Sequence, residues 1–262
     1  MKDFAKEFDT ADRLYHYTTF ETACKILASK KLLFGKICDV NDINESYRSF
    51  YYHSDMSEEQ ISKFEEEWVK YQQISFTEDK NNNVGFYIPA MWGHYAAKGH
   101  GVCLALNKAP VIQRCKDKGY KYSKITYSKS HTSDVCINDT DEPQTVFFNK
   151  KKEIFFEKTQ DWSYEQEFRI VGYGNEKKRL ELSIEDCVLA VIVCYAKNQK
   201  KGELARKSPE YKILKSICTA HSIPVVELGL FFGECNLCGD FTWPISSPGE
   251  YTIDIENRPN QL

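Results

Sequence analysis

The 262-residue sequence lacks several features that would place it at once in a familiar class of protein. No apolar run approaches the roughly 20 residues needed to span a bilayer, and residues 1–9 show no apolar signal region. The sequence has neither the Gly-x-x-x-x-Gly-Lys loop that cradles phosphates nor the Gly-x-Ser-x-Gly turn of serine hydrolases. We therefore expect a soluble, cytoplasmic protein with no membrane partner and with neither of those chemistries.

An excess of positive charge is also absent. The net charge of −3 at pH 7 differs from the basic footprint of a general nucleic-acid-binding protein. A local basic patch remains open as an interpretation, formed by Lys197, Lys200, Lys201, Arg206 and Lys207.

Cysteine is plentiful, with ten residues, but its positions do not indicate a disulfide scaffold. Cys103 and Cys194 lie inside apolar runs, which is typical of buried free thiols in a reducing compartment. Cys235 and Cys238 have a spacing found in metal sites, but a structural zinc ion needs two more ligands. The nearest upstream histidine is His221, so we expect no metal, although metal binding by the two thiols is left open.

The predicted strands and helices alternate without the regular rhythm of a parallel doubly wound sheet, which favours one α+β domain over residues 1–262. The tail is irregular from about residue 235. Capping patterns at 18–21 and 57–60 predict helix starts. Further helices are expected at 91–97, 143–158 and 202–221. Strands are expected at 14–18, 32–35, 73–77, 102–106, 122–127, 162–171, 180–184, 188–195 and 224–232.

The segment Trp-Ser-Tyr-Glu-Gln-Glu-Phe-Arg-Ile-Val at 162–171 carries the most informative pattern. As a strand it would place Glu165, Glu167 and Arg169 on one face, with neighbours about 6.6 Å apart along the chain. Two carboxylates and a guanidinium arranged in this way suit a polar cleft in which one acid is oriented by another charge. A solvent-exposed ladder of ion pairs is the alternative interpretation.

Two other segments carry histidine and aromatic side chains. Leu-Tyr-His-Tyr-Thr at 14–18 places His16 on a strand directly before a capped helix. Met-Trp-Gly-His-Tyr-Ala at 91–96 places Trp92 and His94 near a helix start, where aromatic surfaces can stack on a planar ring or simply anchor the core. A strand histidine can equally be a structural residue.

Taken together, these segments resemble a widespread bacterial family of uncharacterised cytoplasmic proteins. The resemblance rests on the motifs at residues 14–18, 41–45, 74–78, 91–96, 100–104 and 162–169. Phe168 stands where the family usually has tryptophan. Membership by itself implies no activity, because most members have none assigned.

A more distant resemblance, to ADP-ribosyltransferases, is carried by Tyr-His-Tyr-Thr before a helix and by Glu165-Gln166-Glu167 later in the chain. It implies a split, mostly antiparallel β-core with peripheral helices and NAD as substrate. Glu167 would then assist cleavage of the nicotinamide glycosidic bond, and Glu165 would serve the acceptor, a nucleic acid or a protein. The NAD-binding residues implied are His16, Tyr17, Thr18, Trp92, His94, Tyr95 and Arg169.

Several functions therefore stay open. The first is an ADP-ribosyltransferase acting as a toxin or an antiphage effector, or a variant that only hydrolyses NAD. The second is a non-catalytic module that senses a nucleotide or nucleic-acid end through Arg169, His16 and Trp92. The third is another enzyme with a similar cleft, such as a glycosidase or a nuclease. A metal-dependent nuclease is disfavoured because no Asp-rich set of ligands is evident.

Overall fold

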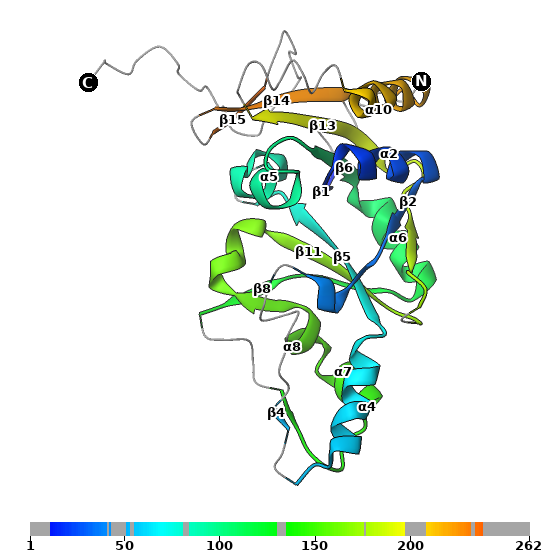
Figure 1. Cartoon of the computed structure of the whole chain (residues 1–262), viewed down its shortest axis with the longest axis vertical. Coiled ribbons are helices and arrows are strands. Elements are labelled where there is room, and N and C mark those ends of the chain that lie inside the picture. The colour runs from blue at the N-terminus through cyan, green and yellow to red at the C-terminus, as the bar shows by residue number, and fades with distance from the viewer. Residues whose placement is uncertain are drawn as a thin grey trace, which may run out of the picture.

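A mixed β-sheet, mostly antiparallel, forms the centre of the molecule, and helices pack outside it (Figure 1). The computed structural model describes residues 11–40, 42, 51–52, 55–80, 84–129, 135–175, 177–196, 208–231 and 234–237. Within them, nine strands form the main sheet in the order β15-β14-β13-β6-β1-β5-β11-β7, and β3 pairs with β5 beside that path. The predicted α+β class is confirmed.

The strands of the main sheet run antiparallel except for β13 and β14, which are parallel. Three two-stranded pairs, β2 with β12, β4 with β9 and β8 with β10, lie outside the main sheet. The strands are β1 (Arg13–Thr18), β2 (Lys31–Leu33), β3 (Gly35–Lys36), β4 (Tyr51–Tyr52), β5 (Tyr71–Glu78), β6 (Val102–Asn107), β7 (Lys121–Lys124), β8 (Thr126–Ser128), β9 (Cys136–Ile137), β10 (Glu157–Thr159), β11 (Glu167–Tyr173), β12 (Glu181–Ser183), β13 (Val188–Ala196), β14 (Val225–Phe231) and β15 (Glu234–Leu237).

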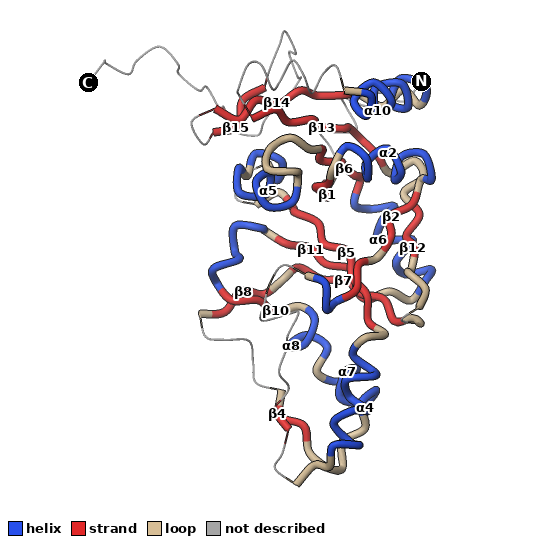
Figure 2. Tube along the Cα trace, viewed as in Figure 1, coloured by secondary structure: helices blue, strands red, loops and turns tan. Residues whose placement is uncertain are grey.

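The helices gather in separate places around the sheet, with α4, α7 and α8 at one end of the long axis and α10 at the other (Figures 1 and 2). The α-helices are α2 (Phe20–Ser29), α4 (Glu58–Trp68), α5 (Pro89–Tyr95), α6 (Lys108–Lys118), α7 (Pro143–Asn149), α8 (Lys151–Phe155) and α10 (Pro209–Ala220). Short 3-10 helices are η1 (Ile37–Asp39), η2 (Gly85–Tyr87) and η3 (Gln160–Glu165).

Three apolar clusters follow from this arrangement. The first joins α2, α6 and α10 to the sheet through residues such as Leu27, Val111 and Leu214. The second joins η2 and α5 to the sheet through side chains that include Trp92. The third, around Phe147, joins α4, α7 and α8. Because adjacent residues of a strand point to opposite faces, neighbouring residues of β1 and β6 belong to different clusters.

Most of the expected elements are present, with their ends shifted. The capping box at Ser57 and Gln60 opens α4 as predicted. The cap of α2 is Thr19, whose hydroxyl accepts a hydrogen bond from the Thr22 backbone N–H, one residue later than the pattern suggested. The expected strand at 122–127 is divided into β7 and β8.

Two larger errors concern helices. The helix expected over 143–158 is two short helices, α7 and α8, followed by β10. The helix α6 was not predicted, because it buries only Val111 and Cys115 and so has almost no apolar stripe. Helix α10 begins at Pro209, and the preceding part of the expected helix at 202–221 lies outside the described residues, as do the five residues of the basic patch.

The cysteines are free thiols where they are described. Cys103 and Cys194 are buried as expected, as are Cys115, Cys187 and Cys218, whereas Cys24 and Cys38 are half-buried and Cys136 is exposed. Within the described ranges no group of three His, Cys, Asp or Glu residues could hold a metal ion. Cys235 lies on β15, and Cys238 is outside those ranges. None of the described helices is both long and apolar enough to cross a bilayer.

Candidate functional site

The sheet opens along one edge of β5, and this opening forms a cavity. On that edge β3 pairs with Gln72 and Gln73, and β1 pairs with Thr77 and Glu78. Residues 74–76 between them have no strand partner on this edge among the described residues. The resulting cavity of about 330 Å³ is lined from β1, β2, β3, η1, β5, α5, β10, η3 and β11, and by Val40 and Asp42 after η1. The opening is thus a gap between β1 and β3 along β5.

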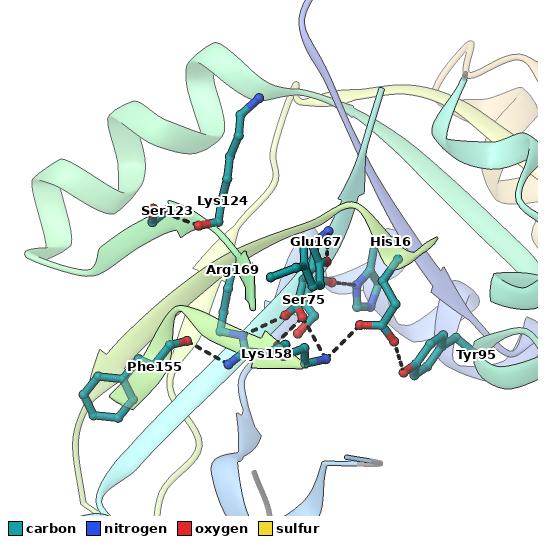
Figure 3. Close-up of polar contacts among 11 residues, drawn as sticks. His16, Ser75, Tyr95, Ser123, Lys124, Phe155, Lys158, Glu167 and Arg169 are labelled. Carbon is teal, nitrogen blue, oxygen red and sulfur yellow. Dashed lines mark hydrogen bonds and ion pairs between the residues drawn. The ribbon is translucent and has the colours of Figure 1, made fainter. Parts of the chain in front are cut away.

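A lysine joins the two glutamates of the Glu-Gln-Glu segment at the wall of this cavity (Figure 3). Lys158 Nζ, on β10, lies 2.7 Å from Glu165 Oε2 and 2.9 Å from Glu167 Oε2. Tyr95 Oη, on α5, donates a hydrogen bond of 2.5 Å to Glu165 Oε1. The cluster therefore draws on three successive elements, β10, η3 and β11, and on the distant helix α5, and the two carboxylates share one cation.

The local backbone around the glutamates differs from the predicted strand. Residues Gln160–Glu165 form η3, and β11 begins only at Glu167. Between them Gln166 adopts a left-handed conformation, with φ 48° and ψ 47°. This conformation costs a residue other than glycine about 1–2 kcal/mol. The turn replaces strand alternation as the reason why Glu165 and Glu167 both reach Lys158.

Arg169 is almost fully buried and binds Glu167 from the protein side. Its Nε donates to Glu167 Oε1 at 2.7 Å, and a terminal nitrogen donates to Oε2 at 2.9 Å. The other terminal nitrogen donates to the Phe155 carbonyl oxygen at the end of α8, at 2.7 Å. Arg169 does not line the cavity, so it positions Glu167 without facing a ligand.

The environments of the two carboxylates push their pKa values apart. Burial raises the pKa of Glu165 above its usual value, despite the nearby charge of Lys158. Burial also acts to raise the pKa of Glu167, but the charges of Arg169 and Lys158 outweigh it and hold that pKa well below the usual range. Such a separation assigns different protonation chemistry to two acids in one site.

Hydrogen bonding also separates the two acids. A carboxylate can accept about four hydrogen bonds. Glu167 accepts two from Arg169, one from Lys158 and one from the Ser75 side chain. Among the described residues, Glu165 accepts only those from Tyr95 and Lys158. Glu165 therefore retains acceptor capacity for a ligand, whereas Glu167 contributes chiefly its fixed negative charge.

His16 lines the same cavity from β1. Its Nδ1 lies 3.2 Å from the Ser75 carbonyl oxygen, so Nδ1 carries the hydrogen of this bond. Burial lowers the pKa of His16, and the bond to Ser75 opposes this shift only in part. The neutral ring then presents Nε2 as a hydrogen-bond acceptor.

The remaining expected site residues divide into two groups. Tyr17 and Tyr95 line the cavity with His16 and both glutamates. Thr18 is buried outside the lining. Trp92 is fully buried in the second cluster, where its Nε1 donates to the Phe86 carbonyl at 2.8 Å. His94 is exposed on α5 beside Tyr164. The structure thus places neither Trp92 nor His94 where it could stack on a ring in the cavity.

Lys158, Gln73, Ser75 and Thr77 are lining residues that sequence reasoning did not single out. The only available signal was for β5, where Gln73, Ser75 and Thr77 alternate with larger side chains and share one face. Lys158 gave no signal, because its role depends on β10, which replaced the end of an expected helix.

One family model matches part of the chain. No curated protein and no solved structure matches it significantly. The region from α5 to β11, which holds Tyr95, Lys158 and both glutamates, is covered by a family match, whereas β1 and β5 precede it. The expectation of an uncharacterised family is therefore confirmed for residues 91–170, which fit the family described as protein of unknown function (DUF2971).

Proposed function

We propose that this protein is an NAD-dependent ADP-ribosyltransferase that transfers ADP-ribose to a nucleic acid or protein acceptor. The observation that carries the proposal is the pair Glu165 and Glu167, held by one lysine at the wall of the cavity and given opposite pKa shifts. Strongly perturbed acids in a cleft are typical of catalytic sites.

The cavity supports a ligand of nucleoside size. Its volume of about 330 Å³ is at the lower end of the range for small-molecule sites. Tyr17, Phe76, Met91 and Tyr95 supply apolar surface, and the carboxylates lie at one wall. This volume suits a planar ring with its ribose, so the adenosine half of NAD would extend beyond it.

The proposed reaction breaks the bond between the ribose C1′ and the nicotinamide nitrogen. The electron pair of that bond leaves with nicotinamide and neutralises its pyridinium charge. The ribosyl group develops oxocarbenium character, which the negative charge of Glu167 stabilises. Because Arg169 and Lys158 keep Glu167 ionised, this charge is present throughout the reaction.

The second half of the reaction joins C1′ to a nucleophilic oxygen or nitrogen of the acceptor. Its proton passes to Glu165, whose raised pKa brings it nearer to the pH of the cell and so makes it a better general base. Water in place of the acceptor gives NAD hydrolysis by the same steps. In this reaction His16 Nε2 would accept a hydrogen bond from a ribose hydroxyl, because Nδ1 is engaged by the Ser75 carbonyl.

A non-catalytic nucleotide-binding module is the second candidate. It is favoured by the full set of hydrogen bonds to Glu167, since a carboxylate already saturated by protein donors can be purely structural. Such a module would bind NAD and leave it intact.

The test is release of nicotinamide from NAD by the purified protein, with Glu167→Gln and Glu165→Gln as variants. Glu66→Gln, on the exposed face of α4, is the matched control. We expect Glu167→Gln to reduce release on the order of 100-fold, as loss of a preorganised transition-state charge does. Glu165→Gln should lower transfer more than hydrolysis. Binding of NAD with no release by the unmodified protein would support the non-catalytic candidate instead.

A further inference from the structure

Two adjacent glutamines on β5 differ in how their side chains are satisfied. The Gln72 side chain is buried and makes three hydrogen bonds, to the Asn175 and Lys178 carbonyls and from the Leu180 N–H. Gln73 is only 6% exposed, yet its Oε1 has no hydrogen-bond partner among the described residues. A buried polar atom without a partner costs about 1–3 kcal/mol and requires an explanation.

The position of Gln73 in the cavity wall explains why its side chain has an unsatisfied oxygen. Gln72 points away from the cavity, whereas Gln73 lines it together with Ser75 and Thr77, which share its face of β5. Ser75 and Thr77 are the strand partners of Arg169 and Glu167. Gln73 therefore lies one step farther along the same row, about 6.6 Å from Ser75. Because the Ser75 side chain donates a hydrogen bond to Glu167, Gln73 is one strand step from a residue that contacts this carboxylate.

Thr77 repeats the observation at the other end of the row. Its side chain is fully buried and lines the cavity, and its Oγ1 also lacks a hydrogen-bond partner among the described residues. Two unsatisfied buried groups on one face, both in the cavity wall, indicate that a ligand provides their partners.

We infer that Gln73 recognises the leaving-group ring of the substrate and selects a ring that carries an uncharged primary carboxamide. This inference rests on the proposed function, because it assumes that the ribose lies beside Glu167. A glutamine side chain offers one acceptor and two donors, so it can form a reciprocal pair of hydrogen bonds with another carboxamide. A ring carboxylate at the same place offers no donor and sets its charge against Oε1.

The experiment compares NAD with its nicotinic acid analogue, in which the ring carboxamide is a carboxylate. Calorimetric titration of the unmodified protein should show at least about tenfold tighter binding of NAD, since a hydrogen bond is lost with the analogue. Gln73→Met, of similar size but without polar groups, should reduce this preference to less than about threefold. Gln73→Glu should weaken NAD binding but increase its advantage over the analogue, through repulsion between two carboxylates.

Gln72→Met is the matched control, because it removes the same group one residue away. It should lower the melting temperature, since three hydrogen bonds are lost, and leave the ligand preference unchanged. Gln73→Met should show the opposite result, with an unchanged or raised melting temperature and a lost preference. If Gln72→Met and Gln73→Met changed the melting temperature equally and changed the preference for NAD equally, the assignment of Gln73 to ligand recognition would be contradicted.

The outcomes separate this inference from the proposed activity. Undiminished preference in Gln73→Met, with nicotinamide release retained, would overturn the role of Gln73 and leave the activity standing. A preference that depends on Gln73, without any nicotinamide release, would overturn the activity and retain the recognition site. If neither dinucleotide binds the unmodified protein, both are wrong.

Discussion

Two buried clusters meet at Phe155, and they are stabilised in opposite ways. In the third apolar cluster, Trp68 stacks on the Phe155 ring with centroids 5.7 Å apart and an interplanar angle of 9°, and Phe147 lies beside both. On the other side, the Phe155 carbonyl accepts a hydrogen bond from Arg169, which belongs to the charged cluster of Lys158, Glu165, Glu167 and Arg169.

The difference lies in what each cluster contributes to folding. Aromatic contacts remove apolar area from water and stabilise the fold directly. Four buried charges that sum to zero roughly offset their own desolvation, so they are a poor source of stability. They are better explained as a preorganised site.

The largest expected effect is on stability, from Phe147→Ala. Removing a buried phenylalanine ring leaves a cavity, and we expect the free energy of unfolding to fall by about 4 kcal/mol. Nicotinamide release per folded molecule should be unchanged, because Phe147 does not line the cavity. Urea unfolding measures the free energy of unfolding, and a nicotinamide assay below the unfolding transition measures the release per folded molecule. If Phe147→Ala lost nicotinamide release but kept its free energy of unfolding, the aromatic cluster would be part of the site and the comparison of the two clusters would fail.

A smaller loss of stability, with loss of activity, is expected from Lys158→Met. Both carboxylates lose a shared cation, and breaking a buried ion pair from one side costs roughly 3 kcal/mol. Protonation of Glu165 would reduce this cost. The control is Lys70→Met, which removes a 39% exposed partner of Glu67, so its effect on the free energy of unfolding should be much smaller. Equal effects of the two variants on unfolding would contradict a buried charged cluster.

The pH dependence of stability should distinguish the two glutamates. The pKa of Glu167 is lowered on folding, so its contribution is present above the usual value of 4.5 and is lost as the pH falls. The pKa of Glu165 is raised, so its contribution is present below 4.5 and is lost as the pH rises through the folded-state value. Glu167→Gln should flatten the acid loss of stability, and Glu165→Gln should remove a gain on mild acidification.

Unfolding free energies at pH 7, 5 and 3.5 for both variants and for Glu66→Gln provide the measurement. Identical pH profiles for Glu165→Gln and Glu167→Gln would show that the two carboxyls have the same environment, against the geometry described above.

The sequence predicted the fold class because the pattern of strands and caps is local. Ser57 and Gln60 form a capping box within four residues, and polar and apolar residues alternate over residues 73–77 of β5. Helix α6 was not predicted, because its two buried side chains are too few to give a periodic apolar pattern. The end of α8 at Phe155 was not predicted, because the last carbonyl of this helix accepts a hydrogen bond from Arg169, which is 14 residues away in sequence.

The candidate site was predictable only in part, for the same reason. The Glu-Gln-Glu spacing identified both carboxylates, but the strand predicted over 162–171 begins only at Glu167, since aromatic composition cannot reveal the left-handed turn at Gln166. Trp92 looked like a stacking surface in sequence and is a core residue, because its indole N–H finds a partner in η2. Lys158 and Gln73 line the cavity that forms where the sheet opens, and no local sequence pattern encodes that opening.

The most direct test of the account is the pH profile of two rates, the release of nicotinamide from NAD and the transfer of ADP-ribose to an acceptor. General-base action by Glu165 predicts that transfer to an acceptor falls on acidification, with a midpoint above 4.5 because burial raises the pKa of this carboxyl. Glu165→Gln should abolish that acid limb and leave slow, pH-independent hydrolysis that still requires Glu167. An acid limb that survives in Glu165→Gln, or no nicotinamide release by the unmodified protein at any pH, would contradict the account.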